Sequence, residues 1–85
     1  MPPRGPLCMP LAEAHRFLAL LKGAENDAWT GVAAKLQLGI DGAAPSAEVT
    51  LIIKEDEAEG FLDLLDAADA LRAAVQTCLN KMRGH

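Results

Sequence analysis

Apolar residues recur in alternating steps of three and four along the last third of the chain, and this pattern limits the folds open to it. The spacing predicts one long amphipathic helix over residues 57–82, about 39 Å long at 1.5 Å per residue. Asp56 and Glu59 have the spacing of a capping box at its start. We expect its apolar residues to form a self-association seam, which comprises Phe61, Leu64, Ala68, Leu71, Val75, Cys78 and Met82.

A shorter helix is predicted near the beginning of the chain, from Pro10 to just before Gly23. Proline suits the first position of a helix, and glycine suits the left-handed residue just past its end. The expected buried stripe contains Leu11, Ala14, Phe17, Leu18 and Leu21. Residues 1–9 contain three prolines, so we predict a flexible arm there, followed by a single domain over residues 10–85.

Two segments in the middle of the chain have the period-two pattern of strands. From Val32 to Ile40 apolar residues alternate with other residues, and a helix there would place Leu38 on the wrong side. The segment EVTLIIK, residues 48–54, is rich in β-branched residues. The short connection between them predicts an antiparallel hairpin. The expected order is helix, strand, strand, helix (αββα), an α+β fold in which we find no internal repeat.

This architecture leaves apolar surface and strand edges uncovered. An isolated two-stranded hairpin is marginally stable in water, and its edges can pair with further strands. We therefore expect a homodimer, in which two hairpins form a four-stranded antiparallel sheet or two long helices pack along their seams. The alternative is a monomer in which the hairpin and the first helix cover the seam.

Composition and charge narrow the range of partners. The formal net charge is −4, whereas nucleic acids and anionic membranes are bound through basic surfaces, so the charge disfavours both. Aromatic residues make up only 4% of the chain, which also disfavours base stacking. Two cysteines do not make a disulfide framework, and the sequence shows no signal peptide and no membrane-spanning segment. We expect a cytoplasmic protein.

No set of residues predicts catalysis or cofactor binding. Cys8 and His15 are the one Cys/His pair close in sequence, but the arm that carries Cys8 cannot hold a fixed geometry. The cysteines and histidines, at positions 8, 15, 78 and 85, lack the paired spacing of metal ligands. We therefore predict a chain that is not an enzyme and has no cofactor and no metal site.

Carboxylates gather on one face of the predicted long helix and just before it. With an exposed leucine among them, they form the candidate protein-binding face: Glu55, Asp56, Glu59, Leu62, Asp63, Asp66 and Asp69. The interpretation without a binding function is a solvated face that keeps the protein soluble. The functional interpretation is a small acidic module that occupies or blocks a surface of a partner protein. A basic surface on that partner would be complementary to it.

Two alternative functions remain open. Carboxylates one helical turn apart approach the spacing of successive phosphates, so the chain could mimic nucleic acid and inhibit a nucleic-acid-processing complex, as phage anti-CRISPR proteins do. That is an analogy of class, because no family motif is present. The second is weak binding of single-stranded nucleic acid through Lys35, Gln37 and Lys54 on the outer hairpin face, near Trp29. The pattern leaves open whether Trp29 lies in the core or at an interface.

Overall fold

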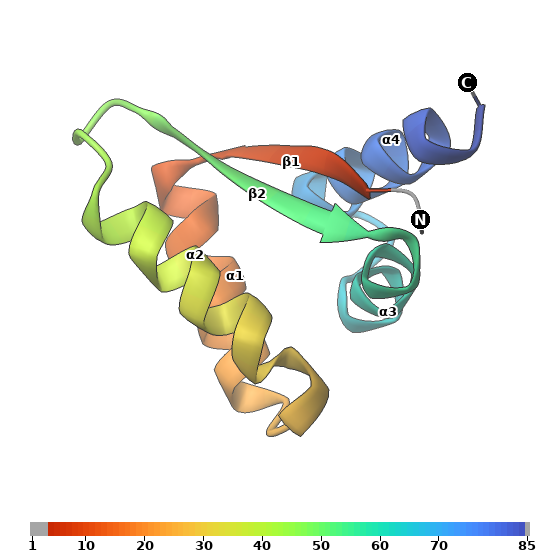
Figure 1. Cartoon of the computed structure of the whole chain (residues 1–85), viewed down its shortest axis with the longest axis horizontal. Coiled ribbons are helices and arrows are strands. Elements are labelled where there is room, and N and C mark those ends of the chain that lie inside the picture. The colour runs from red at the N-terminus through yellow and green to blue at the C-terminus, as the bar shows by residue number, and fades with distance from the viewer. Residues whose placement is uncertain (1–3, 85) are drawn as a thin grey trace. The chain divides into compact units, whose positions relative to one another are not determined.

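The computed structural model describes residues 4–84, in the order strand, helix, helix, strand, helix, helix (Figure 1). Over these residues the fold is α+β, as predicted, with four α-helices, a short 3-10 helix and one two-stranded antiparallel sheet. The elements are β1 Arg4–Pro10, α1 Leu11–Gly23, the 3-10 helix η1 Asp27–Trp29, α2 Thr30–Asp41, β2 Glu48–Lys54, α3 Glu55–Leu64 and α4 Ala70–Gly84.

Strand β1 replaces most of the predicted flexible arm, and residues 1–3 of that arm lie outside the described residues. Its side chains alternate between exposed and buried, with Leu7 and Met9 in the core. The prolines at positions 6 and 10 are exposed, and a two-stranded sheet tolerates them because each strand is an edge strand. The prediction treated proline as evidence against a strand, which holds only for central strands.

Strand β2 confirms the predicted bounds, and Val49, Leu51 and Ile53 are buried as expected. Its predicted pairing is wrong, because β2 pairs with β1 and not with residues 32–40. Across this pair the Cys8 Sγ lies 3.5 Å from the Thr50 Oγ1. The sheet therefore joins segments far apart in the sequence, which the alternation of apolar residues within one strand cannot reveal.

Residues 32–40 belong to helix α2, so the predicted strand there is wrong. The buried residues Val32, Leu36 and Ile40 are four residues apart and form one helical stripe. Leu38 lies off this stripe and is 72% exposed. The prediction assumed that Leu38 has to be buried, which disfavoured a helix, whereas the structure adopts the helix and exposes this leucine.

Helix α1 confirms the predicted short helix, with Pro10 as the N-cap residue and Gly23 as the last residue. Ala14, Phe17, Leu18 and Leu21 are buried, as the stripe predicted. The left-handed residue after the helix is Glu25, with φ of 52°, and not Gly23. A non-glycine residue in this region costs about 1–2 kcal/mol.

The predicted single helix over residues 57–82 is wrong, because α3 ends at Leu64 and α4 begins at Ala70. The break has a local cause: the Asp69 Oδ1 accepts a hydrogen bond of 2.8 Å from the Leu71 N–H and so caps a second helix. The capping box also lies elsewhere. Helix α3 begins at Glu55, so the carboxylate of Glu57, not of Glu59, accepts a hydrogen bond of 2.9 Å from the Lys54 N–H.

The structure reveals an internal repeat, contrary to the expectation of none. Both strands and the helices that directly follow them begin 44 residues apart, at positions 4 and 48 and at positions 11 and 55. At the same offset EAHRFLALL, residues 13–21, aligns with EAEGFLDLL, residues 57–65, and six of the nine positions are identical. The second helices match more weakly, through buried residues at the same spacing: Val32, Leu36 and Ile40 in α2, and Leu71, Val75 and Leu79 in α4.

The described chain divides into two compact units. One contains residues 8–51, in which α1 packs against α2, and the other contains residues 4–7 and 52–84, in which α3 packs against α4. Phe17 and Leu36 are fully buried in the first unit, and Phe61, Leu71, Val75 and Leu79 are fully or almost fully buried in the second. Full burial of such side chains contributes about 1.5–3 kcal/mol each.

Candidate functional site

Helices α1 and α2 lie side by side within the unit formed by residues 8–51 (Figure 1). A groove lies at their junction. Its volume is about 490 Å³, within the range of sites that bind drug-sized ligands. Leu21, Trp29, Ala33 and Ala34 supply apolar lining. Three charged residues also line it: Lys22, Glu25 and Asp27.

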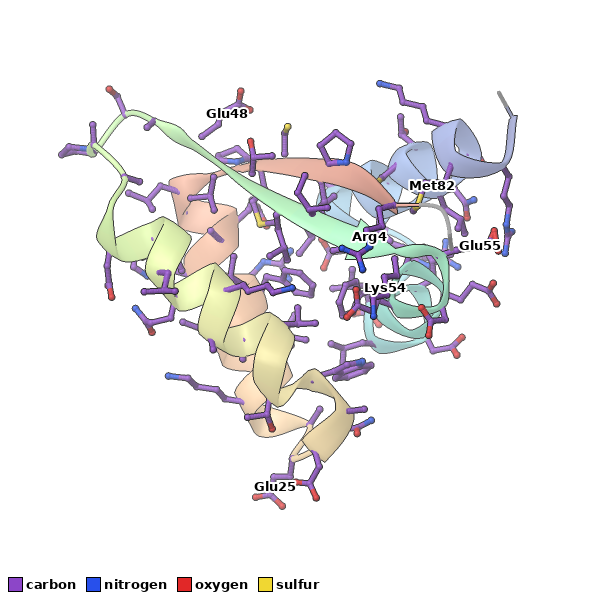
Figure 2. The ribbon with its side chains drawn as sticks, in the orientation of Figure 1. Arg4, Glu25, Glu48, Lys54, Glu55 and Met82 are labelled. Carbon is purple, nitrogen blue, oxygen red and sulfur yellow. The ribbon has the colours of Figure 1, made fainter. Side chains whose placement is uncertain are left out.

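Hydrogen bonds and one unusual backbone conformation shape this junction. The Ala24 N–H donates to the Leu20 carbonyl at 3.0 Å and closes α1, and the Glu25 N–H donates to the Lys22 carbonyl at 3.3 Å. The left-handed conformation of Glu25 then reverses the chain. Figure 2 shows Glu25 at the tip of this helix pair, with its side chain pointing away from the helices.

The segment after Glu25 holds Trp29 at the groove. The Asn26 Oδ1 accepts a hydrogen bond of 2.9 Å from the Ala28 N–H and thereby caps η1. The Trp29 N–H donates to the Asn26 carbonyl at 2.9 Å, which fixes the backbone of the tryptophan. Trp29 is half-buried, so it lies outside the fully buried core and contributes to the wall of a groove.

An exposed apolar residue lies on α2 beyond the groove. Ala34 lines the groove, and Leu38 follows it by four residues, which places both on the same helix face. Between them in sequence, Gln37 also lines the groove, and its Nε2 donates to the Asp41 Oδ1 at 2.8 Å. We call the groove and Leu38 together the α1–α2 face.

No family model matches the chain, and no curated protein or solved structure is significantly similar to it. Inference about function therefore rests on the geometry of its own residues.

The residues of the predicted acidic face do not share one helix. Glu55, Asp56, Glu59, Leu62 and Asp63 lie on α3, whereas Asp66 and Asp69 lie in the connection to α4. Leu62, expected to be exposed, is half-buried. Arg83 on α4 contacts Glu55 at 3.2 Å and Glu59 at 2.6 Å, and Asp56 accepts a hydrogen bond of 3.0 Å from the Glu57 N–H. Asp69 caps α4, so little of the expected face is left as a regular array of free charges.

The predicted self-association seam is interrupted by the connection between α3 and α4. Phe61, Leu71, Val75 and Cys78 are buried in the core of their unit, Leu64 and Met82 are half-buried, and Ala68 is exposed in the connection between the helices. The continuous stripe on which the seam was based is therefore absent from the described residues, 4–84. A homodimer stays a prediction.

Other predicted residues are also placed by the structure. Lys35 and Gln37 lie on helix α2, so the outer sheet face expected to bind single-stranded nucleic acid loses two of its three residues. Cys8 is exposed on β1 and Cys78 is buried on α4. Within residues 4–84 no three Cys, His, Asp or Glu side chains are arranged to hold a metal ion, and no helix has the length and apolar character needed to cross a membrane.

The sequence patterns did not predict the groove, although two signals pointed to it. The single tryptophan of the chain lies beside acidic and amide residues in a connection, where nothing in the local pattern explains its burial. Leu38 was the second signal, because it was the residue that a helix could not bury. Read as a helix, residues 30–41 would have placed Leu38 one turn beyond Ala34, which lines the groove.

Proposed function

We propose that this chain is a small, non-catalytic protein-interaction module that acts by occupying a partner's surface, and that the α1–α2 face is its contact surface. The observation that carries the proposal is the groove lined by the half-buried Trp29 and the small alanines of α2, with the exposed Leu38 one helical turn beyond Ala34. A single exposed leucine is ordinary in a soluble protein. Tryptophan, in contrast, is enriched among the residues that carry most of the binding energy at protein interfaces, and Trp29 lines this groove.

The lining of the groove favours binding over catalysis. The described residues that line it include no histidine, cysteine or serine, so no nucleophile is paired there with a histidine base. Two polar side chains of the lining, Asn26 and Gln37, are engaged in hydrogen bonds within the chain. Such groups shape a surface and do not move protons.

The internal repeat supplies matched control positions for a test. Aligning the buried residues of α2 with those of α4 pairs Gln37 with Gln76 and Leu38 with Thr77. A photo-crosslinking amino acid is placed at position 37 in one variant and at position 76 in another. We expect a partner protein to be captured from position 37 and not from position 76.

Purified partner is then titrated with the chain. Leu38→Glu is expected to weaken binding tenfold or more, equivalent to about 1.4 kcal/mol, because it places a charge in an apolar contact. Thr77→Glu, which adds the same charge to α4, is expected to leave binding unchanged. Both variants should keep the melting temperature of the original chain. Equal crosslinking from both positions, or equal binding by both variants, would contradict the proposal.

A further inference from the structure

The charges around the groove distinguish it from a purely apolar docking site. Glu25 and Asp27 flank the apolar lining, and Lys22 is the only basic residue among the described lining residues. The lining therefore carries one net negative charge, in a chain whose formal net charge is −4. A partner segment with a positive charge is electrostatically complementary to it.

The two carboxylates are available to such a partner. Within residues 4–84 neither the Glu25 nor the Asp27 side chain makes a hydrogen bond or an ion pair. This differs from the acidic residues of α3, where Glu55 and Glu59 are held by Arg83. The positive φ of Glu25 fixes the backbone at the tip of the helix pair, and the side chain extends outward from it (Figure 2).

Trp29 adds a second feature that favours a cationic side chain. The face of an indole ring attracts the guanidinium group of arginine or the ammonium group of lysine through its quadrupole. Both side chains have an aliphatic stem below the charged group, and the stem packs well against apolar surface. Leu21, Ala33 and Ala34 offer such a surface in the same groove.

We propose that the α1–α2 face binds a short protein segment in which an arginine or lysine is followed by an apolar residue. This inference rests on the proposed function. The cationic head lies beside Trp29, Glu25 and Asp27, its stem packs against the alanines of α2, and the apolar neighbour contacts Leu38. Arginine is favoured over lysine because its planar guanidinium group can stack on the indole and donate to two carboxylates together.

The test uses three blocked synthetic peptides, identical except at the central residue, which is arginine, citrulline or glutamate between two leucines. Citrulline keeps the shape of arginine and removes its charge. Trp29 is the only tryptophan of the chain, so its fluorescence reports directly on the groove. We expect saturable quenching by the arginine peptide with a Kd near or below about 1 mM, and binding about three- to tenfold weaker for citrulline.

Matched variants then separate the local carboxylates from the net charge. E25Q/D27N is expected to weaken binding of the arginine peptide by about three- to tenfold and to bring it to the level of the citrulline peptide. E48Q/D63N removes the same net charge from exposed positions on β2 and α3, and it should leave the affinity unchanged. Melting temperatures of all variants confirm that they are folded.

The inference is overturned if the arginine and citrulline peptides bind equally, if E25Q/D27N and E48Q/D63N behave alike, or if no peptide quenches Trp29 up to about 5 mM, well above the expected Kd. These results leave the proposed function standing, because that proposal depends on the crosslinking and on the Leu38→Glu variant. If Leu38→Glu has no effect on the captured partner while the arginine peptide still binds in the groove, the proposed contact surface is wrong and the cation site is right.

Discussion

The α1–α2 and α3–α4 helix pairs share an interior and differ in the segments that join their helices. Ala14, Phe17 and Leu21 in the first pair correspond to Ala58, Phe61 and Leu65 in the second, and all six are buried. The first junction is a turn with a left-handed glutamate, a 3-10 helix and a groove. The second is shorter, and its aspartate caps the next helix directly.

Under the proposed function, this difference gives the two repeats separate roles. The buried alanine, phenylalanine and leucine are the same in both pairs, and the buried residues of the second helix keep their spacing, since a loss of volume there would cost packing energy. The tryptophan occurs in one repeat alone, and in the second repeat the corresponding connection carries the small exposed Ala68. The acidic residues of the second repeat bind Arg83 and cap helices, whereas those at the first junction have open carboxylates. We therefore assign stability to the common core, and the proposed binding role belongs to the α1–α2 face.

The largest expected effect tests the common core. Phe17→Ala and Phe61→Ala each remove a side chain with no exposed surface. We expect each substitution to lower the free energy of unfolding by about 3–5 kcal/mol, as measured by urea denaturation monitored by circular dichroism. Equivalent repeats predict losses that agree within about 1 kcal/mol, the spread expected from local relaxation. A loss below about 1 kcal/mol at either position would show that its repeat lacks a tightly packed interior.

A smaller effect separates the two junctions. Asp69→Ala removes the acceptor that caps α4 and should cost about 1–2 kcal/mol, since the carboxylate also interacts favourably with the start of a 15-residue helix. Asn26→Ala removes the cap of a three-residue 3-10 helix and should cost about 0.5–1 kcal/mol. Thermal unfolding of both variants measures which of them loses more stability. Asp69→Asn keeps the acceptor and is the control, and the comparison fails if Asn26→Ala is the more destabilising change.

The smallest effect concerns the ion pairs that link α3 to α4. Arg83→Ala removes contacts with Glu55 and Glu59, but all three side chains are between 34% and 55% exposed. We expect a loss of about 0.2–1 kcal/mol at low salt. In about 1 M NaCl the Debye length is only about 3 Å, so the difference between Arg83→Ala and the original chain should largely disappear. A loss that persists in high salt would indicate a packing role for the arginine stem.

Local patterns in the sequence predicted only part of this fold. The bounds of β2 and the buried stripe of α1 were readable, because each depends on the spacing of residues within one element. The strand pairing could not be predicted, because β1 and β2 begin 44 residues apart and the prolines of β1 disfavoured a strand there. The break at residues 65–69 was missed because the apolar spacing continues through it. Asp69, interpreted as part of an acidic face, is in fact the cap that starts a new helix.

The candidate site was less predictable than the fold. A groove depends on how two helices meet, and no periodicity within one helix describes that junction. Misassigning α2 as a strand moved Lys35, Gln37 and Leu38 onto a sheet that does not exist and separated them from Trp29. The homodimer prediction relied on an open hairpin and a long seam. Over residues 4–84 the long seam is interrupted between α3 and α4, whereas the sheet keeps two edge strands, so light scattering at two protein concentrations is the test of the homodimer.

The pairing of β1 with β2 also has a consequence for the order in which the chain folds. Each helix pair is closed by a connection of only a few residues, so its contacts are local and can form within microseconds. The sheet has to bring together side chains such as those of Cys8 and Thr50, which are 42 residues apart, and that requires closing a much longer loop. Both strands pass from one compact unit to the other, after Leu7 and after Leu51. We therefore expect the two helix pairs to form first and the β1–β2 sheet to form last, as the rate-limiting step of folding.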